Sequence, residues 1–488
     1  MNIKELLKSI DYIETKGNLD VIIEDITNDS RIVSNKKAFI AIKGFRADGH
    51  DFIDSAIKNG CKTIFHQDDL ANYLEDVAYI KIEDSRKSLA KVSSVLYNKP
   101  SESFSLVGIT GTNGKTTTTY MLENILNYNN ISTASIGTIG VKLNGRNLKT
   151  NHTTPEANEL QKIFSKVKNE EIKVCVMEVS SHALDLNRVD ESDFDYGIFT
   201  NLSLEHMDFH KNMENYFNAK KKLFYMSKKS NLVNIDDEYG KRLFQELKKD
   251  KIKVKSFGIK NDCDYKAENI KASMVETNFD FITPYGKRNI TIPISVIYNV
   301  YNAISAMGIA MEMGLTLDEV VEAMENYGGA KGRYEVVENK KDLNIVIDFA
   351  HTPDAYENLL NFVSKNVDGK IYFVFGVNGD RTVEIRESMG NIAAKYADSL
   401  IITSDDPNYD TYENISKDIL NGVKKTDNQN YILIKDREEA IKWAIKKATK
   451  DDLVLLVGKG HEMFMKYNGE KIPYDERKVV ERILSELN

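Results

Sequence analysis

Short apolar runs alternate with amphipathic stretches along most of the chain. The run FSLVGIT at residues 104–110 is followed by the glycine-rich loop GTNG and by a stretch whose apolar residues share one helical face. Two more runs, at residues 174–179 and 194–202, have the composition of buried strands. Strands that alternate with helices in this way are typical of a parallel sheet with crossover helices. The pattern therefore predicts an α/β fold.

The last third of the chain repeats this pattern, which predicts a second doubly wound, Rossmann-like unit. Its strand-like runs lie at residues 343–349, 371–375, 400–403, 431–434 and 453–457. The first hundred residues mix strands and helices and end in YNKPSES, which has the composition of a linker. We therefore expect three domains, at residues 1–100, 101–331 and 332–488.

Composition narrows the classes of function. The chain has 488 residues, of which 41% are hydrophobic and 29% charged, so it can bury several apolar cores. The net charge of -8, from 66 basic and 74 acidic residues, gives no global basic field, and we expect no nucleic-acid partner. The three cysteines lack metal-ligand spacing, and no apolar run approaches the length of a membrane span. These features predict a cytoplasmic protein without membrane insertion.

The strongest local motif is the loop that follows residue 110. Its residues are Gly111, Thr112, Asn113, Gly114, Lys115, Thr116 and Thr117. The amides of such a loop converge on phosphate oxygens, the helix N-terminus and the lysine add positive charge, and the threonine after the lysine can ligate Mg²⁺. The strict GxxxxGK[ST] spacing is not met, because Ile109 stands at the first glycine position. A glycine-rich turn with a chance lysine is the alternative to the nucleoside triphosphate site that the motif predicts.

Acidic and histidine residues follow the next two strand-like runs. Glu178 closes the run VCVME at the sheet edge where ligands usually bind, and a carboxylate there can hold Mg²⁺ beside phosphates. The segment TNLSLEHMDFH at residues 200–210 offers Glu205 and His206 as further metal ligands. A strand-end glutamate is also a common solvated or capping residue. The basic run at residues 220–222 has, on composition alone, the character of a solvated helix face.

Polar clusters follow four of the strand-like runs in the last third. They are AHTPDA after Asp348, and then GDR, TSDDPN and GKGHE. Parallel strands end at the same edge of a sheet, so we expect these clusters to meet there. Arg381, Asp405, Asp406 and Glu462 among them suit a substrate that carries both ammonium and carboxylate groups.

Taken together, these motifs resemble the Mur ligase family, and most of all its UDP-N-acetylmuramyl-tripeptide synthetases. The match covers essentially the whole chain and rests on DSR (29–31), DGH (48–50), GTNGKTTT, TTP (153–155), EVSSH, TNLSLEH, Asn299 with Asn302, GR (332–333), DFAHTP, GDR and KGHE. The resemblance implies an N-terminal mixed α/β domain for the UDP end of the substrate, a central P-loop ATPase domain and a C-terminal Rossmann-like domain for an amino acid. ATP would phosphorylate a carboxylate of UDP-N-acetylmuramoyl-L-alanyl-D-glutamate. The amine of a free diamino acid would then displace the phosphate and form an amide of the peptidoglycan precursor.

The resemblance also implies a role for each matching residue. The catalytic residues would be Lys115, Glu178, His206 and Lys220. Mg²⁺ would be held by Thr116, Glu178, His206 and Lys220, the last as a carbamate. The adenine and ribose of ATP would contact Asn299, Asn302, Arg333 and Asp348. The uridine end would face Ser30, Asp48, Gly49 and His50, and the muramyl dipeptide would face Thr153, Thr154, Ser180 and Arg188. The amino acid would be bound by His351, Arg381, Asp405, Asp406, Asn408, Gly458 and Glu462.

The prediction of which amino acid is added depends on a single motif. Family members that add meso-diaminopimelate typically carry DNPR, whose arginine clamps the distal carboxylate, whereas this chain has DDPN at residues 405–408. Asn408 in place of arginine removes a bidentate cation, and Asp406 in place of asparagine adds an anion that would repel a carboxylate. We therefore favour L-lysine. The alternatives are meso-diaminopimelate and meso-lanthionine, because Gly458 and Glu462 are kept.

Two other functions are compatible with part of the pattern. Folylpolyglutamate synthetase shares the ATPase core, but it would not be expected to carry the DSR and DGH segments. A P-loop switch or transport ATPase would hydrolyse ATP without either acceptor substrate. We expect a monomeric ligase. Its sequence departs from the family pattern at Val296 and Tyr298, where Gly and Phe are usual.

Overall fold

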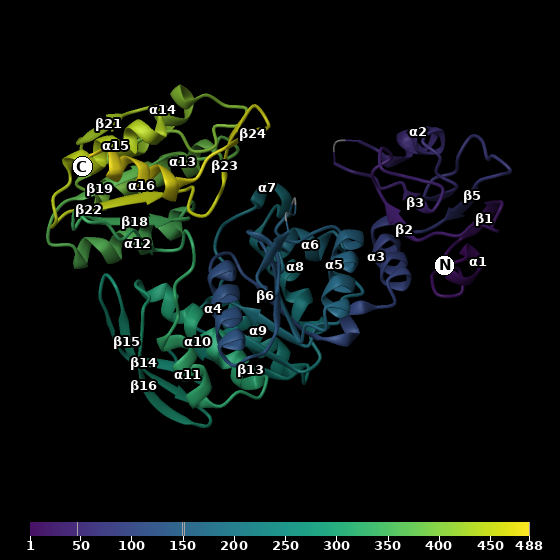
Figure 1. Cartoon of the computed structure of the whole chain (residues 1–488), viewed down its shortest axis with the longest axis horizontal. Helices are drawn as coiled ribbons and strands as arrows, with labels where there is room; N and C mark the ends of the chain where they lie inside the picture. The colour runs from purple at the N-terminus through teal and green to yellow at the C-terminus, as the bar shows by residue number, and fades with distance from the viewer. Residues whose placement is uncertain (46, 149, 151, 488) are drawn as a thin grey trace. The chain divides into compact units, whose positions relative to one another are not determined.

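The computed structural model of the chain describes residues 1–45, 47–148, 150 and 152–487. These residues pack into two compact units, Met1–Thr119 with Leu126–Ser256 and Tyr120–Ile125 with residues 257–487. Figure 1 labels their helices and strands. Both units combine helices with sheets, which confirms the predicted α/β fold class. Within the described ranges, no helix is long and apolar enough to cross a membrane.

The N-terminal part of the first unit is a five-stranded sheet in the order β1-β5-β4-β3-β2, in which only β1 is antiparallel to its neighbour. The strands are β1 (Glu14–Gly17), β2 (Asp25–Thr27), β3 (Lys37–Ile40), β4 (Thr63–His66) and β5 (Ala78–Lys81), and the helices are α1 (Ile3–Leu6), α2 (Ile53–Lys58) and α3 (Ser85–Leu96). Asp84 caps α3, because its side chain accepts hydrogen bonds from the amides of Arg86 and Lys87. Ile40 and Leu89 belong to the core between this sheet and α3.

The rest of the first unit is built on strands of a second sheet that lie in the order β12-β11-β6-β10-β7-β8-β9. Its strands are β6 (Ser105–Thr110), β7 (Thr133–Gly137), β8 (Gly140–Leu143), β9 (Arg146–Leu148), β10 (Val174–Glu178), β11 (Tyr196–Phe199) and β12 (Ser230–Asn234). The strands β12, β11, β6, β10 and β7 are parallel, whereas β8 and β9 extend the sheet as an antiparallel hairpin. The predicted strands at residues 104–110, 174–179 and 194–202 are thus confirmed as β6, β10 and β11.

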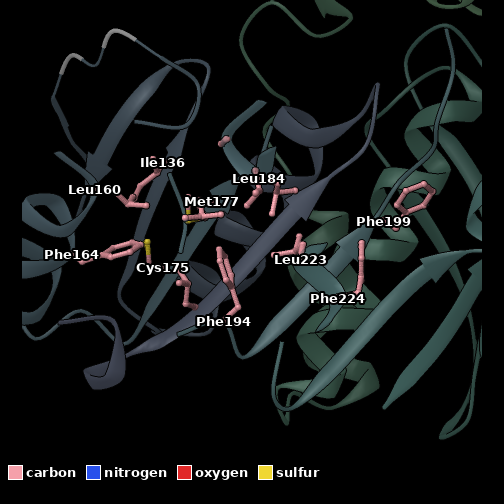
Figure 2. Packing of buried hydrophobic residues seen from close by; sticks show 14 of the residues in the cluster. Ile136, Leu160, Phe164, Cys175, Met177, Leu184, Phe194, Phe199, Leu223 and Phe224 are labelled. Atoms are coloured by element: carbon pink, nitrogen blue, oxygen red, sulfur yellow. The ribbon is translucent and has the colours of Figure 1, made fainter. Parts of the chain in front are cut away.

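Helices cover this sheet and enclose one large apolar core (Figure 2). They are α5 (Ala157–Asn169), α6 (Ser181–Asp185), α7 (Met207–His210), α8 (Met213–Met226) and α9 (Glu238–Lys249), and a further helix, α4 (Lys115–Tyr128), follows β6 in the chain. Phe164 of α5 lies beside Cys175 of β10, and Leu223 and Phe224 of α8 belong to the same core. Because apolar side chains fill the sheet faces, the polar residues of this region are concentrated in the loops at the strand ends.

The second unit contains an antiparallel meander that the sequence did not predict. Its strands are β14 (Tyr265–Ala272), β15 (Thr277–Thr283) and β16 (Gly286–Ile292), preceded by β13 (Val254–Gly258) and followed by α10 (Ile297–Glu312) and α11 (Leu317–Glu325). Val296, just before α10, has φ 70° and ψ 128° and is fully buried. This backbone conformation favours glycine, so the β-branched Val296 adopts it at a strain of about 1–3 kcal/mol.

The C-terminal sheet has the order β17-β18-β22-β19-β20-β21 and is parallel except for β17. Its strands are β17 (Glu335–Val336), β18 (Asn344–Asp348), β19 (Ile371–Phe375), β20 (Ser399–Ile402), β21 (Tyr431–Leu433) and β22 (Leu453–Val457), so the five predicted strands are confirmed. Its helices are α12 (Pro353–Asn366), α13 (Val383–Tyr396), α14 (Tyr412–Val423), α15 (Arg437–Lys447) and α16 (Glu476–Glu486), and a hairpin of β23 (Phe464–Tyr467) and β24 (Glu470–Pro473) follows β22. Phe373 and Val374 point into separate cores, as expected of a sheet that is covered on both faces.

Candidate active site

The predicted phosphate-binding loop joins β6 to α4 in the first unit. Lys115, the first residue of α4, bends back so that its Nζ donates to the carbonyl oxygens of Gly111 and Thr112, at 2.9 and 2.8 Å. Gly111 has no room for a side chain, because a Cβ atom there would lie 1.9 Å from Oγ1 of Thr200. A lysine over a tight glycine loop at a helix N-terminus gives the positive potential that phosphate groups need.

The segment after β11 holds this loop in place. The amide of Asn113 donates to Oδ1 of Asn201 at 2.9 Å, and Oγ1 of Thr200 donates to the carbonyl oxygen of Asn113 at 2.6 Å. The amide of Thr112 donates to the carbonyl oxygen of Asn201 at 2.9 Å. Sequence reasoning connected residues 200–210 with metal ligation and missed this supporting role. The only signal for this role in the sequence is that Thr200 and Asn201 follow β11, the strand directly beside β6.

Glu178 ends β10 and is almost completely buried beside the start of α4. Its Oε2 accepts hydrogen bonds from the hydroxyl groups of Thr116 and Thr138, both at 3.0 Å, and its Oε1 accepts the amide of Thr138 at 3.0 Å. The predicted carboxylate and the predicted threonine ligand are therefore in direct contact. Thr138, in the turn between β7 and β8, was not among the predicted site residues.

Histidines gather around α6 and α7. The rings of His182 and His206 lie edge to face with centroids 4.8 Å apart, and Nε2 of His206 is 3.8 Å from Oε2 of Glu205. His210 stacks on Tyr216, and its Nε2 is 2.9 Å from Oγ of Ser181. Burial lowers the pKa of His206 to about 4. At neutral pH its imidazole is neutral, the form that can ligate a metal.

The three lysines of α8 have different surroundings. Lys220 is 2% exposed, and its Nζ donates to the carbonyl oxygen of Gly111 at 2.8 Å and lies 4.7 Å from the ring centroid of Tyr216. Burial, and then the charge of Lys115, lower the pKa of Lys220 well below its usual value. Lys221 and Lys222 instead pair with Glu246 and Asp185. This shift favours the neutral form of the amine, which is the form that can add CO₂ to become a carbamate.

Four residues predicted to bind the muramyl dipeptide lie together near β10. Oγ1 of Thr154 donates to the carbonyl oxygen of Glu178 at 2.9 Å and accepts the amide of Ser180 at 3.0 Å. Arg188 donates to the carbonyl oxygen of Thr154 at 3.2 Å and forms an ion pair with Glu156 at 2.8 Å. The hydroxyl of Thr153 is 3.4 Å from that of Thr138. These contacts connect the predicted dipeptide side with the Glu178 side of the same sheet edge.

The predicted uridine residues lie in the N-terminal sheet region. His50 uses both ring nitrogens within the fold, because Nδ1 lies 2.6 Å from Oδ1 of Asp48 and Nε2 accepts the amide of Gln67 at 3.0 Å. Gly49 starts a 3₁₀ turn between them. Ser30 is buried, and its carbonyl oxygen accepts a hydrogen bond from Asn59. The DGH motif therefore forms a hydrogen-bonded turn, and its backbone and the Asp48 carboxylate are the groups that it can offer a ligand.

In the second unit, the predicted nucleoside-binding residues fall into two local pairs. Nδ2 of Asn302 donates to Oδ1 of Asn299 at 3.1 Å, one turn earlier on α10, and both side chains are buried. Arg333 lies over the ring of Phe349, 4.5 Å from its centroid. Asp348, at the end of β18, accepts the amides of Tyr334 and Ala350 at 2.7 Å. Burial raises the pKa of Asp348 and the Arg333 charge opposes this shift.

A cavity of about 190 Å³ opens at the carboxyl ends of the C-terminal strands. The predicted amino-acid residues that line it are His351, Arg381, Asp405, Asp406, Gly458 and Glu462. Lys466 of β23 also lines the cavity, and sequence reasoning missed it because it lies outside the strand-end motifs. Asn408 is not among the lining residues. Its Nδ2 donates to both carboxylate oxygens of Asp380 at 3.0 Å, and its Oδ1 accepts the amide of Gly469 at 3.0 Å.

One buried ammonium group organises the acidic wall of this cavity. Lys459 is completely buried, and its Nζ lies 2.7 Å from Asp406, 2.6 Å from Glu462 and 3.9 Å from Asp405. Burial disfavours the charge of Lys459, but the three carboxylates outweigh this effect and raise its pKa. Burial also raises the pKa of Asp405 to about 6. Gly458 has φ 102°, and a Cβ atom there would lie 2.0 Å from Oδ2 of Asp405, so this wall requires glycine.

Three family profiles match successive parts of the chain: "Mur ligase family, catalytic domain" at residues 22–97, "Mur ligase middle domain" at 109–310 and "Mur ligase, glutamate ligase domain" at 332–460. A protein of Alkaliphilus metalliredigens named UDP-N-acetylmuramoyl-L-alanyl-D-glutamate--2,6-diaminopimelate ligase is 41% identical over 100% of this chain and 98% of its own length. A protein of Caldanaerobacter subterraneus with the same name is 43% identical over 100% of this chain and 99% of its own length.

Solved structures of related ligases have a fold similar to that of this chain. A structure of a UDP-N-acetylmuramoyl-L-alanyl-D-glutamate--2,6-diaminopimelate ligase is similar with a TM-score of 0.72 and 26% identity, and the match covers 100% of this chain and 99% of the other. A MurF ligase from Thermotoga maritima in complex with ADP matches with a TM-score of 0.61 at 21% identity, over 95% of this chain and 97% of the other. The similarity thus extends over all parts of the fold described above.

Proposed function

The chain belongs to the Mur ligase family of ATP-dependent ligases, and we propose that it joins meso-diaminopimelate to UDP-N-acetylmuramoyl-L-alanyl-D-glutamate. The observation that carries this proposal is the cavity at the C-terminal sheet, whose wall holds both carboxylates and cations. An amino acid with two ammonium and two carboxylate groups matches such a wall. The names of the relatives that match the full chain point to the same amino acid.

The prediction of L-lysine is not confirmed, because the relatives are named diaminopimelate ligases. Its physical argument also weakens in the structure. Asp406, expected to repel a carboxylate, is 2% exposed and paired with Lys459 at 2.7 Å, so its charge is compensated inside the protein. We therefore adopt meso-diaminopimelate as the substrate, which is the alternative that the sequence left open.

The chemistry follows from the groups at the first unit's sheet edge. Lys115 and the loop amides would hold the phosphates of ATP while the γ-phosphoryl group passes to the carboxylate of the D-glutamyl residue, which gives ADP and an acyl phosphate. The neutral amine of the diamino acid would then attack the carbonyl carbon. The C–O bond to phosphate would break, phosphate would leave, and the amine would lose a proton. Phosphorylation is needed because a free carboxylate has no good leaving group.

The donor set beside the loop fits a divalent cation such as Mg²⁺. It comprises the Glu178 carboxylate, the Thr116 hydroxyl and the neutral imidazole of His206, with Lys220 as a further oxygen ligand if it is carbamylated. When bound, the cation would neutralise charge on the phosphates. Thr138 would keep the Glu178 carboxylate oriented through its two hydrogen bonds.

A competition experiment tests the proposal. Purified protein receives UDP-N-acetylmuramoyl-L-alanyl-D-glutamate, ATP and Mg²⁺ with equal concentrations of meso-diaminopimelate, L-lysine and meso-lanthionine, and mass spectrometry identifies the products. The diaminopimelate product should dominate, and phosphate release should require both the nucleotide peptide and the amino acid. A dominant lysine product would refute the substrate assignment. Rapid ATP hydrolysis without either acceptor would refute the acyl-phosphate route.

A further inference from the structure

Lys466 is a cavity-lining cation with no assigned role. Its side chain is half-buried on β23, and its Nζ lies 5.8 Å from the ring centroid of Phe464. Within the part of the chain that the structure describes, this ammonium forms no ion pair. We propose that Lys466 binds the carboxylate that diaminopimelate carries and lysine lacks, and so determines which diamino acid the enzyme accepts. This inference rests on the function proposed above.

The charges around the cavity support this role. Lys459 is surrounded by Asp405, Asp406 and Glu462, and its single positive charge leaves two negative charges uncompensated. These acids can receive the ammonium groups of a substrate. Arg381 and Lys466 are the cations that line the cavity. A substrate with one carboxylate needs one of them, whereas a substrate with two carboxylates can use both.

The backbone contacts of Lys466 place it beside the segment of the DDPN motif. Its amide donates to Oδ1 of Asp406 at 2.9 Å, and its carbonyl oxygen accepts the amide of Asn408 at 3.1 Å. The side chain of Asn408 is directed to Asp380 and supplies no charge to the cavity. Position 466 therefore supplies a cation to the cavity, whereas position 408 supplies none. Asp406 supports this arrangement because it binds both the Lys466 amide and the Lys459 ammonium.

Lys466→Met tests the inference, because it removes the charge and keeps an apolar stem of similar length. We expect kcat/KM for meso-diaminopimelate to fall about 10- to 100-fold, mainly through KM, as for the loss of a charged hydrogen bond. The kcat/KM for L-lysine should change less than about twofold, and Lys466→Arg should restore most of the diaminopimelate efficiency.

Lys471→Met is the matched control. Lys471 lies on β24 of the same hairpin, 4.2 Å from the ring centroid of the same Phe464, but it is not among the residues that line the cavity. We expect this variant to retain the wild-type kcat/KM for both amino acids. It therefore separates a specific contact in the cavity from a general loss of positive charge on the hairpin.

The outcomes distinguish the two proposals. Wild-type enzyme that uses lysine better than diaminopimelate would refute the proposed function before any variant is compared. If the wild type prefers diaminopimelate, the inference about Lys466 is overturned when Lys466→Met keeps its diaminopimelate KM, or when it loses efficiency equally with both amino acids. A selective loss with diaminopimelate that arginine restores would support it, and this arginine rescue can be measured even where lysine turnover is very slow.

Discussion

The buried ion pair between Arg437 and Glu476 predicts how the amino-acid cavity depends on the C-terminal fold. Nη2 and Nε of Arg437 lie 2.6 and 2.9 Å from the two carboxylate oxygens of Glu476, and the side chains are 2% and 0% exposed. Arg437 also donates to the carbonyl oxygens of Val457, at 2.7 Å, and Ser404, at 3.4 Å. These residues directly precede Gly458 and Asp405, so the guanidinium connects two segments of the cavity wall.

Glu476→Gln would leave the Arg437 charge buried without its partner. Loss of one member of a buried pair costs about 3–5 kcal/mol. For a domain of about 150 residues, each kcal/mol lowers Tm by about 2–4 °C, so we expect the unfolding transition of this domain to fall by about 6–20 °C. In the same variant, the KM for the diamino acid should rise, because the Val457 and Ser404 carbonyl oxygens lose a fixed hydrogen-bond donor. The KM for ATP should stay nearly constant.

Differential scanning calorimetry and steady-state kinetics on the full chain measure these effects. The control is Glu481→Gln on the same helix, where the carboxylate pairs with Arg477 at 2.8 Å and is 56% exposed. An exposed pair contributes about 0.3–0.5 kcal/mol, so its transition should move by no more than about 2 °C. Equal shifts for the two variants would show that burial of the Arg437 pair does not control the stability of this domain.

Two further predictions concern the site itself. Lys220→Ala should lower kcat by about 100-fold, as for a residue that supports a metal site, while Lys221→Ala should keep nearly the wild-type kcat because Lys221 pairs with Glu246. After incubation with ¹³C-bicarbonate, the NMR signal of a carbamate should be lost in Lys220→Ala alone. Persistence of the signal in that variant would exclude Lys220 as its source. Burial raises the pKa of Asp405 to about 6, so the KM for the diamino acid should rise as the pH falls through about 6, because the neutral carboxyl group no longer attracts an ammonium group. Asp405→Asn should flatten this rise. An unchanged pH profile in that variant would assign the titration to another group.

Sequence patterns were sufficient to predict those features whose residues follow one another closely along the chain. The strand, glycine loop and helix around Lys115 follow one another in the chain, and Glu178 closes a neighbouring parallel strand, so their meeting at one sheet edge follows from topology. The five C-terminal strands could be predicted for the same reason, since each is a short buried run between helices.

Contacts between distant segments could not be predicted in this way. Thr138 reaches Glu178 from a turn forty residues earlier, and Asn201 reaches the phosphate-binding loop from the next strand. The charge on Asp406 appeared free in the sequence because its partner, Lys459, lies 53 residues later. The lysine prediction, which is not confirmed, treated the Asp406 charge as available to the substrate, whereas the fold pairs this carboxylate with Lys459.

The arrangement around Lys459 has a consequence for how this region can evolve. Asp405, Asp406 and Glu462 share one ammonium group that has no access to solvent. An aspartate at position 406 instead of asparagine differs by one full charge, and the solvent cannot screen that difference here. Substitutions at these four positions should therefore occur in compensating pairs, and sequences of homologues should show position 406 covarying with a cation nearby.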